Sequence, residues 1–334
     1  MMQTDSRLTG DINITEARSN LDDCIKKLLS NKQILARIMK ECVSEYAGCS
    51  VDEIISLIEP SSPNRDSETI SGRNTEDVGI DDGTVRYDIL FDAALPGCED
   101  RVGLIINVEA QNDFSPGYSL IRRGLYYCAR LISGQKGHEF AHSEFNNIVK
   151  VYSLWICMKP TSPAKNTITR YSVGEECLVG SNAAAKKDYD ILSMVLIGLS
   201  EIEPSEAASG IIDMLSILLS RKLESRIKIA ELERKYDISP TVEMKGDIAK
   251  MCDYSDGVYR DGYNSGVQYG LSQGIEQGIE QGISVGVRQG SYDMLCKCVK
   301  GFLAMGLSPE KIALITQTEL DTVLEVIRNE SDGE

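Results

Sequence analysis

The sequence predicts an α/β protein, in which a mixed β-sheet is flanked by helices and followed by a helical C-terminal tail. Two observations predict the sheet and its helices. Apolar runs typical of strands occur over roughly the first 240 of the 334 residues, and segments of helical spacing alternate with them. A third predicts the tail, because from Gly262 to Gly290 glycine recurs at every fourth position. We therefore expect a folded core and a separate repeat region.

The N-terminal part of the chain has helical spacing. Residues 14–46 have helical composition, and Ile34, Ile38 and Cys42 fall on one face at i, i+4 and i+8. A short amphipathic helix is expected at 51–58, and 60–82 is rich in Ser, Asn, Asp and Gly, which is typical of a loop.

The strands are predicted from alternation and from apolar runs. Residues 85–93 alternate in polarity, and 102–112 form a second strand after the turn residues Pro96 and Gly97, so the two strands should pair as an antiparallel hairpin. Continuous apolar runs at 149–158 and 191–199 predict two further strands.

Two helices are expected around these later strands. In 118–133, Ile121, Leu125, Cys128 and Ile132 share one face, which we expect to lie on the sheet, while Arg123, Tyr126 and Arg130 point roughly the opposite way. Residues 209–235 predict one long amphipathic helix.

The tail carries two parallel stripes if it is helical. The residue after each glycine is apolar in seven of the repeats, from Tyr263 to Val287, so an apolar stripe runs beside the glycine stripe. We expect Gly262–Gly290 to be a helix that mediates homo-oligomer formation, since bare glycine lets another helix approach closely. A flexible linker and packing within the chain remain alternatives. Three short helices are expected at 292–305, 309–316 and 319–328.

Composition excludes several classes of protein. We find no basic and apolar N-terminal signal pattern and no apolar run near the ~20 residues that span a bilayer, so we expect a soluble, cytoplasmic protein with no membrane partner. The ten cysteines are scattered and predicted to be reduced. Cys296 and Cys298, with no second pair and no nearby His, are a poor signal for zinc. His138 and His142 have the i, i+4 spacing of two ligands on one helix face, but their surroundings are more typical of a polar segment between elements.

Charge is distributed unevenly. The formal net charge of −16 taken alone disfavours a nucleic-acid partner, because Lys and Arg dominate phosphate binding. Residues 114–174, however, contain eight basic and two acidic side chains, a local net charge of +6. We call this segment the basic island. Its first four basic residues, Arg122, Arg123, Arg130 and Lys136, are the candidate DNA-binding residues, with a plain solvated helix face as the alternative for the arginines.

The chemistry concentrates on three residues of the predicted hairpin. Asn107, Glu109 and Gln111 share one face of their strand, and Asp88 interrupts an otherwise apolar part of the pairing strand. Two carboxylates on adjacent strands can converge on Mg²⁺ or Mn²⁺, which prefer oxygen ligands. The alternative is that Asp88 lies at the hairpin edge and that Glu109 and Gln111 lie on a solvated sheet face.

This arrangement resembles the PD-(D/E)XK nuclease superfamily, and more narrowly the family of recombination-promoting nucleases and putative transposases. Four segments carry the resemblance: Arg86-Tyr-Asp-Ile-Leu-Phe, Ile105-Ile-Asn-Val-Glu-Ala-Gln, Arg123-Gly-Leu-Tyr-Tyr and Val151-Tyr-Ser-Leu-Trp-Ile-Cys. It covers about residues 30–200, and the glycine repeat is similar to that family's C-terminal region. The resemblance implies a restriction-endonuclease-like core and a nuclease that acts on DNA with Mg²⁺ or Mn²⁺.

The resemblance also implies residue roles. Asp88 and Glu109 match the metal-binding acids, and Gln111 matches the position usually held by lysine. An acid from an N-terminal helix often completes such sites, and here Glu41 is preferred to Glu45. The neutral Gln111 can orient a water but cannot stabilise an anion as an ammonium would. We therefore expect either slow catalysis or a cation supplied by Arg123 or another side chain of the basic island.

We therefore predict a Mg²⁺-dependent DNA endonuclease. The alternative is a catalytically weak or inactive protein of the same fold that acts as an oligomeric nucleic-acid-binding protein or scaffold. The expected organisation is an N-terminal helical extension (1–30), the nuclease-like core with its following helix (31–240), the repeat helix or linker (241–291) and a small helical region (292–334).

Overall fold

The computed structural model describes residues 19–64, 66–79, 83–199 and 210–331. The chain divides into two compact units, Met1–Arg260 and Asp261–Glu334. The boundary falls within the segment 241–291 that the sequence singles out as a repeat helix or linker.

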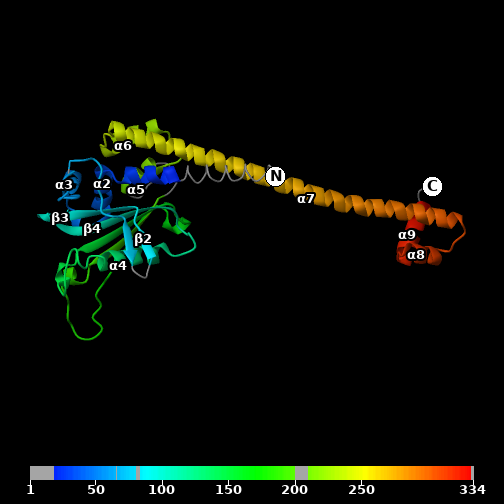
Figure 1. Cartoon of the computed structure of the whole chain (residues 1–334), viewed down its shortest axis with the longest axis horizontal. Coiled ribbons are helices and arrows are strands. Elements are labelled where there is room, and N and C mark those ends of the chain that lie inside the picture. The colour runs from blue at the N-terminus through cyan, green and yellow to red at the C-terminus, as the bar shows by residue number, and fades with distance from the viewer. Residues whose placement is uncertain (1–18, 65, 80–82, 200–209, 332–334) are drawn as a thin grey trace. The chain divides into compact units, whose positions relative to one another are not determined.

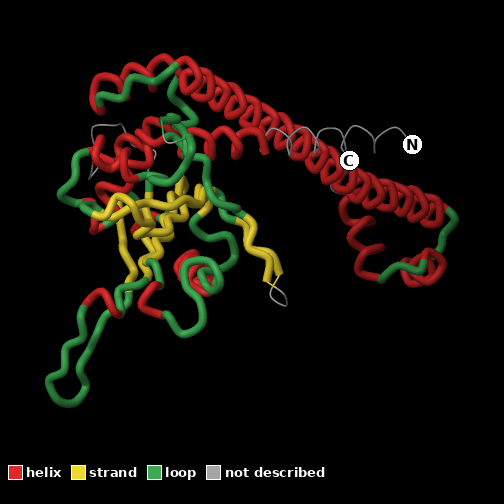
Figure 2. Tube along the Cα trace, turned by 60° about the vertical axis from the view of Figure 1, so that its left-hand side comes forward, coloured by secondary structure: helices red, strands yellow, loops and turns green. Residues whose placement is uncertain are grey.

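The first unit is built on a five-stranded mixed sheet with the order β3-β4-β5-β7-β6 (Figures 1 and 2). Its strands are β3 (Ile89–Leu95), β4 (Cys98–Asp113), β5 (Lys150–Lys159), β6 (Thr167–Ser172) and β7 (Leu192–Gly198). β4, β5 and β7 run parallel, and the two edge strands are antiparallel to their neighbours. The predicted α/β class with a mixed sheet is confirmed.

The predicted hairpin is confirmed, with a shorter first strand. β3 pairs with β4 around Pro96 and Gly97, with Ile89 opposite Val108. Residues 83–86 instead form β2 (Gly83–Arg86), which pairs with β1 (Glu76–Gly79) in a separate two-stranded sheet. β1 lies in the segment 60–82 that the sequence predicts to be a loop. The chain changes sheet at Tyr87, whose N–H donates to the Thr75 carbonyl at 2.9 Å. Asp88 is thereby left between the two sheets.

One face of the five-stranded sheet is covered by helices from both ends of the first unit. They are the helix 19–29, α2 (Lys32–Cys42), α3 (Val51–Leu57), α5 (Gly210–Leu219), α6 (Ser225–Tyr236) and the first turns of α7 (Val242–Ala304). The predicted helix 14–46 is broken at Asn31, whose side chain accepts the N–H of Gln33 and begins α2; residues 14–18 lie outside the described residues. The predicted helix 209–235 is likewise two helices.

The helix 19–29 belongs to this core rather than standing apart as an extension. Its residues Leu21, Ile25, Leu28 and Leu29 are buried in the same cluster as Ile106 and Val108 of β4. This placement brings the polar side of the helix toward the open end of the β3–β4 hairpin, away from its turn.

The opposite face of the sheet is covered by α4 (Leu120–Ser133), and the predicted buried stripe of this helix is partly wrong. Leu120, Gly124, Tyr127 and Cys128 face the sheet, whereas Leu125 is 36 % exposed. Gly124 explains why α4 turns this face to the sheet and not the predicted one. A Cβ at Gly124 would lie 2.6 Å from Met194 Cγ and 2.9 Å from Trp155 Nε1. The missing side chain lets α4 lie close against β5 and β7.

The second unit contains the rest of α7, α8 (Pro309–Thr316) and α9 (Leu320–Ser331). The helical state expected for the glycine repeat is confirmed, and α8 and α9 correspond to the last two predicted helices. A small core of Val299, Ile312, Val323 and Val326 joins α8 and α9 to the end of α7. No helix in the described part of the chain has the length and apolar character needed to cross a bilayer.

Four single 3-10 turns complete the described elements: η1 (Ser44–Tyr46), η2 (Phe145–Asn147), η3 (Ser162–Ala164) and η4 (Lys186–Asp188).

Candidate functional site

The structure brings Asp88 and Glu109 into contact at the entry to β3. Asp88 directly precedes Ile89, which is opposite Val108, so Asp88 lies level with Glu109. The backbone N–H of Asp88 donates to Glu109 Oε1 at 3.1 Å, and the N–H of Ala110 donates to Asp88 Oδ2 at 3.0 Å. The two carboxylates that the sequence paired by register are therefore neighbours, and backbone hydrogen bonds fix their positions.

Burial and a neighbouring negative charge both disfavour the ionised state of Glu109. The Glu109 side chain is only 4 % exposed, and burial together with the charge of Asp88 raises the pKa of Glu109 well above its usual range. Arg123 acts in the opposite direction but does not offset these two effects. A positive charge placed beside both acids would favour the ionised state of Glu109.

The helix 19–29 supplies two charged groups that sequence reasoning missed. Lys26 Nζ lies 2.9 Å from Asp88 Oδ1. Asp22, one turn earlier, is close enough for Asp88 to raise its pKa; burial is the largest cause of that shift, and Lys26 opposes it. The i, i+4 spacing of Asp22 and Lys26 was the available signal, since these positions share one helix face. The prediction of one continuous helix over 14–46 did not separate this signal from the rest of the helix.

Gln111 lies two residues beyond Glu109 on β4, opposite Cys157 of β5, and is half-buried. Deeper on the same face, Asn107 donates to Ser153 Oγ at 3.1 Å, and the Trp155 indole N–H donates to the same oxygen at 2.8 Å. These side chains are completely buried beneath α4. The polar face expected for β4 therefore exists, but a helix covers it and it is not solvated. The acid pair lies where this polar face approaches the protein surface.

Arg123 of α4 is held in a fixed orientation beside the acid pair. Its Nη2 donates to the Tyr127 hydroxyl at 2.7 Å and its Nη1 to the Tyr118 hydroxyl at 2.6 Å. The guanidinium also lies 5.1 Å from the ring centroid of Tyr127 and 5.2 Å from that of Trp155. Arg123 thus approaches Glu109 closely enough to lower the pKa of that acid, while the described hydrogen bonds of its guanidinium go to tyrosines.

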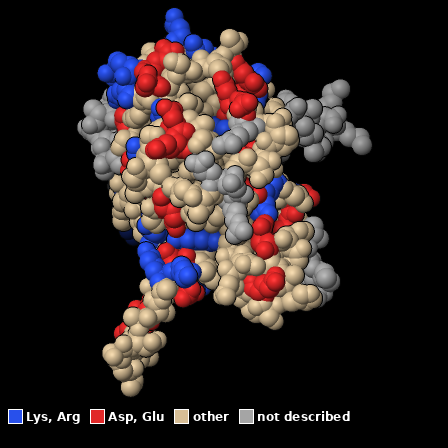
Figure 3. All heavy atoms as spheres, turned by 90° about the vertical axis from the view of Figure 1, so that its left-hand side faces the viewer, with Lys and Arg blue, Asp and Glu red and all other residues tan. Residues whose placement is uncertain are grey.

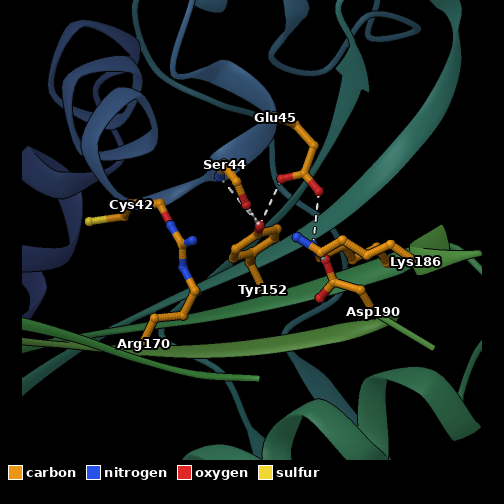
Figure 4. Close-up of polar contacts among 8 residues, drawn as sticks. Cys42, Ser44, Glu45, Tyr152, Arg170, Lys186 and Asp190 are labelled. Atoms are coloured by element: carbon orange, nitrogen blue, oxygen red, sulfur yellow. Dashed lines mark hydrogen bonds and ion pairs between the residues drawn. The ribbon is translucent and has the colours of Figure 1, made fainter. Parts of the chain in front are cut away.

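The structure does not bring Glu41 or Glu45 to this site. Glu41 is exposed on α2, which packs on the opposite face of the sheet, and among the described contacts of Asp88 and Glu109 none comes from it. Glu45 points toward the start of β5, where it accepts from the Tyr152 hydroxyl at 2.7 Å and from Lys150 Nζ at 2.9 Å (Figure 4). Glu41 does not join the acid pair because α2 packs on the sheet face opposite to the one that carries Glu109.

The other predicted DNA-binding residues differ in their surroundings. Arg122 and Lys136 are exposed, whereas Arg130 Nε forms an ion pair with Asp77 Oδ2 at 2.8 Å. Elsewhere in the basic island, Lys150 is held by Glu45 and Asp190, and Arg170 donates to the Cys42 carbonyl. On the face shown in Figure 3, basic and acidic side chains are interspersed. Part of the island's positive charge is therefore neutralised locally.

The acid pair offers a metal ion two carboxylates. Among the described residues, no group of three or more His, Cys, Asp and Glu side chains is placed to bind a metal. Mg²⁺ is commonly bound by only one or two carboxylates and completes its shell with waters and substrate phosphates. Asp88 and Glu109 supply such a pair, and their mutual repulsion is what a divalent cation would relieve.

A search of protein-family models, of curated proteins and of solved structures finds no match to this chain.

Proposed function

We propose that the protein is a divalent-metal-dependent DNA endonuclease with a restriction-endonuclease-like core, of the recombination-promoting, transposase-like type that its motifs resemble. The observation that carries the proposal is the contact between Asp88 and Glu109: the backbone N–H of Asp88 donates to the Glu109 carboxylate, so an acid directly before β3 and an acid of β4 are neighbours. Gln111 lies on the same face of β4, and two cationic side chains, Lys26 and Arg123, flank the pair.

Each residue has a role that follows from its position. Asp88 and Glu109 would hold the Mg²⁺, which would supply Lewis acidity at a phosphodiester and lower the pKa of an attacking water. Gln111 orients that water through its carboxamide. Lys26 and Arg123 stabilise negative charge on the phosphate, the work that a lysine at position 111 would do. Arg122 and Lys136, both exposed, contact the DNA backbone.

Cleavage of a supercoiled plasmid tests the proposal. With MgCl₂ or MnCl₂ the wild-type chain should nick the plasmid, and EDTA should stop the reaction. Asp88→Asn and Glu109→Gln should each reduce cleavage by about 10²-fold or more, because each removes a metal ligand. The matched control is Asp92→Asn, an acid of β3 that pairs with Arg73 Nη1 at 3.2 Å and should leave cleavage unchanged.

A second readout separates metal binding from catalysis. MgCl₂ should raise the melting temperature of the wild type and of Asp92→Asn, but not that of Asp88→Asn or Glu109→Gln, because a ligand that binds only the folded state stabilises it. Wild-type cleavage rates in folded Asp88→Asn and Glu109→Gln would contradict the proposed site.

A second candidate function has its own support. Lys26 already lies on an oxygen of Asp88, and Gln111 brings no charge, so the same fold can serve as a DNA-binding protein or scaffold without hydrolysis. This alternative predicts DNA binding that is indifferent to EDTA, with no nicking in either metal.

A further inference from the structure

The middle of α7 carries an apolar stripe that nothing in the second unit covers among its described residues. Six side chains at four-residue intervals are each between 51 and 65 % exposed: Val267, Leu271, Ile275, Ile279, Ile283 and Val287. Isolated exposed apolar residues are ordinary, but a continuous row of branched aliphatic side chains marks an interaction surface.

The glycines beside this stripe are equally uncovered. A Cβ placed on any glycine from Gly266 to Gly290 would meet no atom within 4 Å outside its own helical turn. Glycine is a poor helix former, and burial normally compensates for its use in a helix interior. The described contacts of the second unit provide no such burial at this segment, so a surface outside that unit would have to provide it.

We propose that this stripe docks onto the same stripe of a second copy of the chain, with the two helices antiparallel and centred on Gly282. Charge selects a second copy as the occupant. Residues 266–290 contain only Glu276, Glu280 and Arg288 as charged side chains, although the whole chain has a net charge of −16. This segment is therefore a place where two copies can approach each other with little repulsion.

The antiparallel direction follows from the order of those charges. A parallel pair in register would align Glu276, Glu280 and Arg288 with themselves. Antiparallel helices centred on Gly282 bring Arg288 of one copy level with Glu276 of the other, and they do so twice because of the two-fold symmetry. In the same register each apolar side chain falls midway between two of the other copy, so the two stripes interdigitate.

The four-residue period limits the length of the contact. Four residues turn the helix by about 400°, so the stripe drifts by about 40° per repeat in the right-handed sense. A straight partner helix therefore contacts the stripe over only about three repeats, because beyond them the stripe has turned away from the partner. Ile279 and Ile283, the stripe residues on either side of Gly282, should contribute most to the contact.

Sedimentation equilibrium of the full chain between about 1 and 100 µM tests the proposal. The wild type should be a dimer that dissociates on dilution. Ile279→Ala with Ile283→Ala should raise the dissociation constant by roughly tenfold or more, because apolar burial is lost. Alanine is a better helix former than isoleucine, so loss of helix does not explain that result. The matched control is Gln277→Ala with Gln281→Ala, which should leave the constant unchanged.

Charge reversal tests the antiparallel register. Arg288→Glu should weaken the dimer, and Glu276→Arg in the same chain should restore it. A monomeric wild type, or equal weakening by the isoleucine and glutamine variants, would overturn the proposal. A double charge variant weaker than Arg288→Glu alone would overturn the antiparallel arrangement.

Discussion

Lys26 occupies a position with two opposed consequences for the acid pair. Its ammonium forms an ion pair with Asp88 and so occupies an oxygen that a metal ion would use. The same positive charge would stabilise the negative charge that develops on a phosphate during hydrolysis. A cation in this position is expected to weaken metal binding while it speeds the chemical step.

Lys26→Met should therefore change binding and catalysis in opposite directions. We expect Mg²⁺ affinity to rise about fivefold, from loss of an ion pair worth about 1 kcal/mol, and cleavage at saturating Mg²⁺ to fall by about 10²-fold. Calorimetric titration and a nicking assay measure the two effects.

The neighbouring lysine provides the control for this substitution. Lys27 pairs with Glu243 and Asp247 of α7 instead of the acid pair, so Lys27→Met should alter neither quantity. A Lys26→Met variant that binds Mg²⁺ less well and cleaves normally would remove Lys26 from the site.

At the level of elements, α4 depends on a position that has no side chain. The absence of a Cβ at Gly124 lets the helix lie close to Met194 and Trp155 of the sheet, and this close approach places Arg123 beside Glu109. In an exposed helix the same glycine would only weaken the structure.

Gly124→Ala should therefore destabilise the protein, although alanine favours the helix. We expect the free energy of unfolding to fall by about 1–3 kcal/mol, because the added Cβ overpacks the layer between α4 and β5. Gly246→Ala is the control: it lies in α7 of the same unit with open space around it, and should stabilise the protein by up to about 1 kcal/mol. Urea unfolding measures both. Equal stabilisation by the two variants would show that α4 is not closely packed at Gly124.

The elements also show how far the sequence alone predicts this structure. The β3–β4 hairpin and the apolar strands β5 and β7 follow from local patterns, and so does the meeting of Asp88 with Glu109. Lys26 and Asp22 do not, because their approach depends on a break at Asn31 and on tertiary packing. β6 was missed because an edge strand with little burial lacks a regular apolar alternation.

Across the whole molecule, the distribution of charge determines how the protein can meet DNA. The basic island contains exposed residues, such as Arg122 and Lys136, and residues neutralised in place, such as Arg130. Only exposed cations release counterions when they contact phosphates.

Arg122→Ala with Lys136→Ala should therefore weaken DNA binding and reduce the slope of log K against log salt by about two. The control removes one positive and one negative charge together: Asp77→Asn with Arg130→Gln should leave the slope unchanged, because the ion pair already cancels. Fluorescence anisotropy over a range of NaCl concentrations measures both. An unchanged slope in the Arg122 and Lys136 variant would mean that DNA contacts another surface.

The repeat in α7 also determines which changes of length this helix can absorb. Gly274-Ile-Glu-Gln and Gly278-Ile-Glu-Gln are identical consecutive tetrapeptides. Gain or loss of one such unit moves the following turns by about 6 Å along the helix axis, turns them by only about 40° and leaves the sequence of both stripes intact. Insertion of a single residue instead turns everything after it by about 100° and interrupts both stripes. Length variants of this chain should therefore be tolerated in steps of four residues.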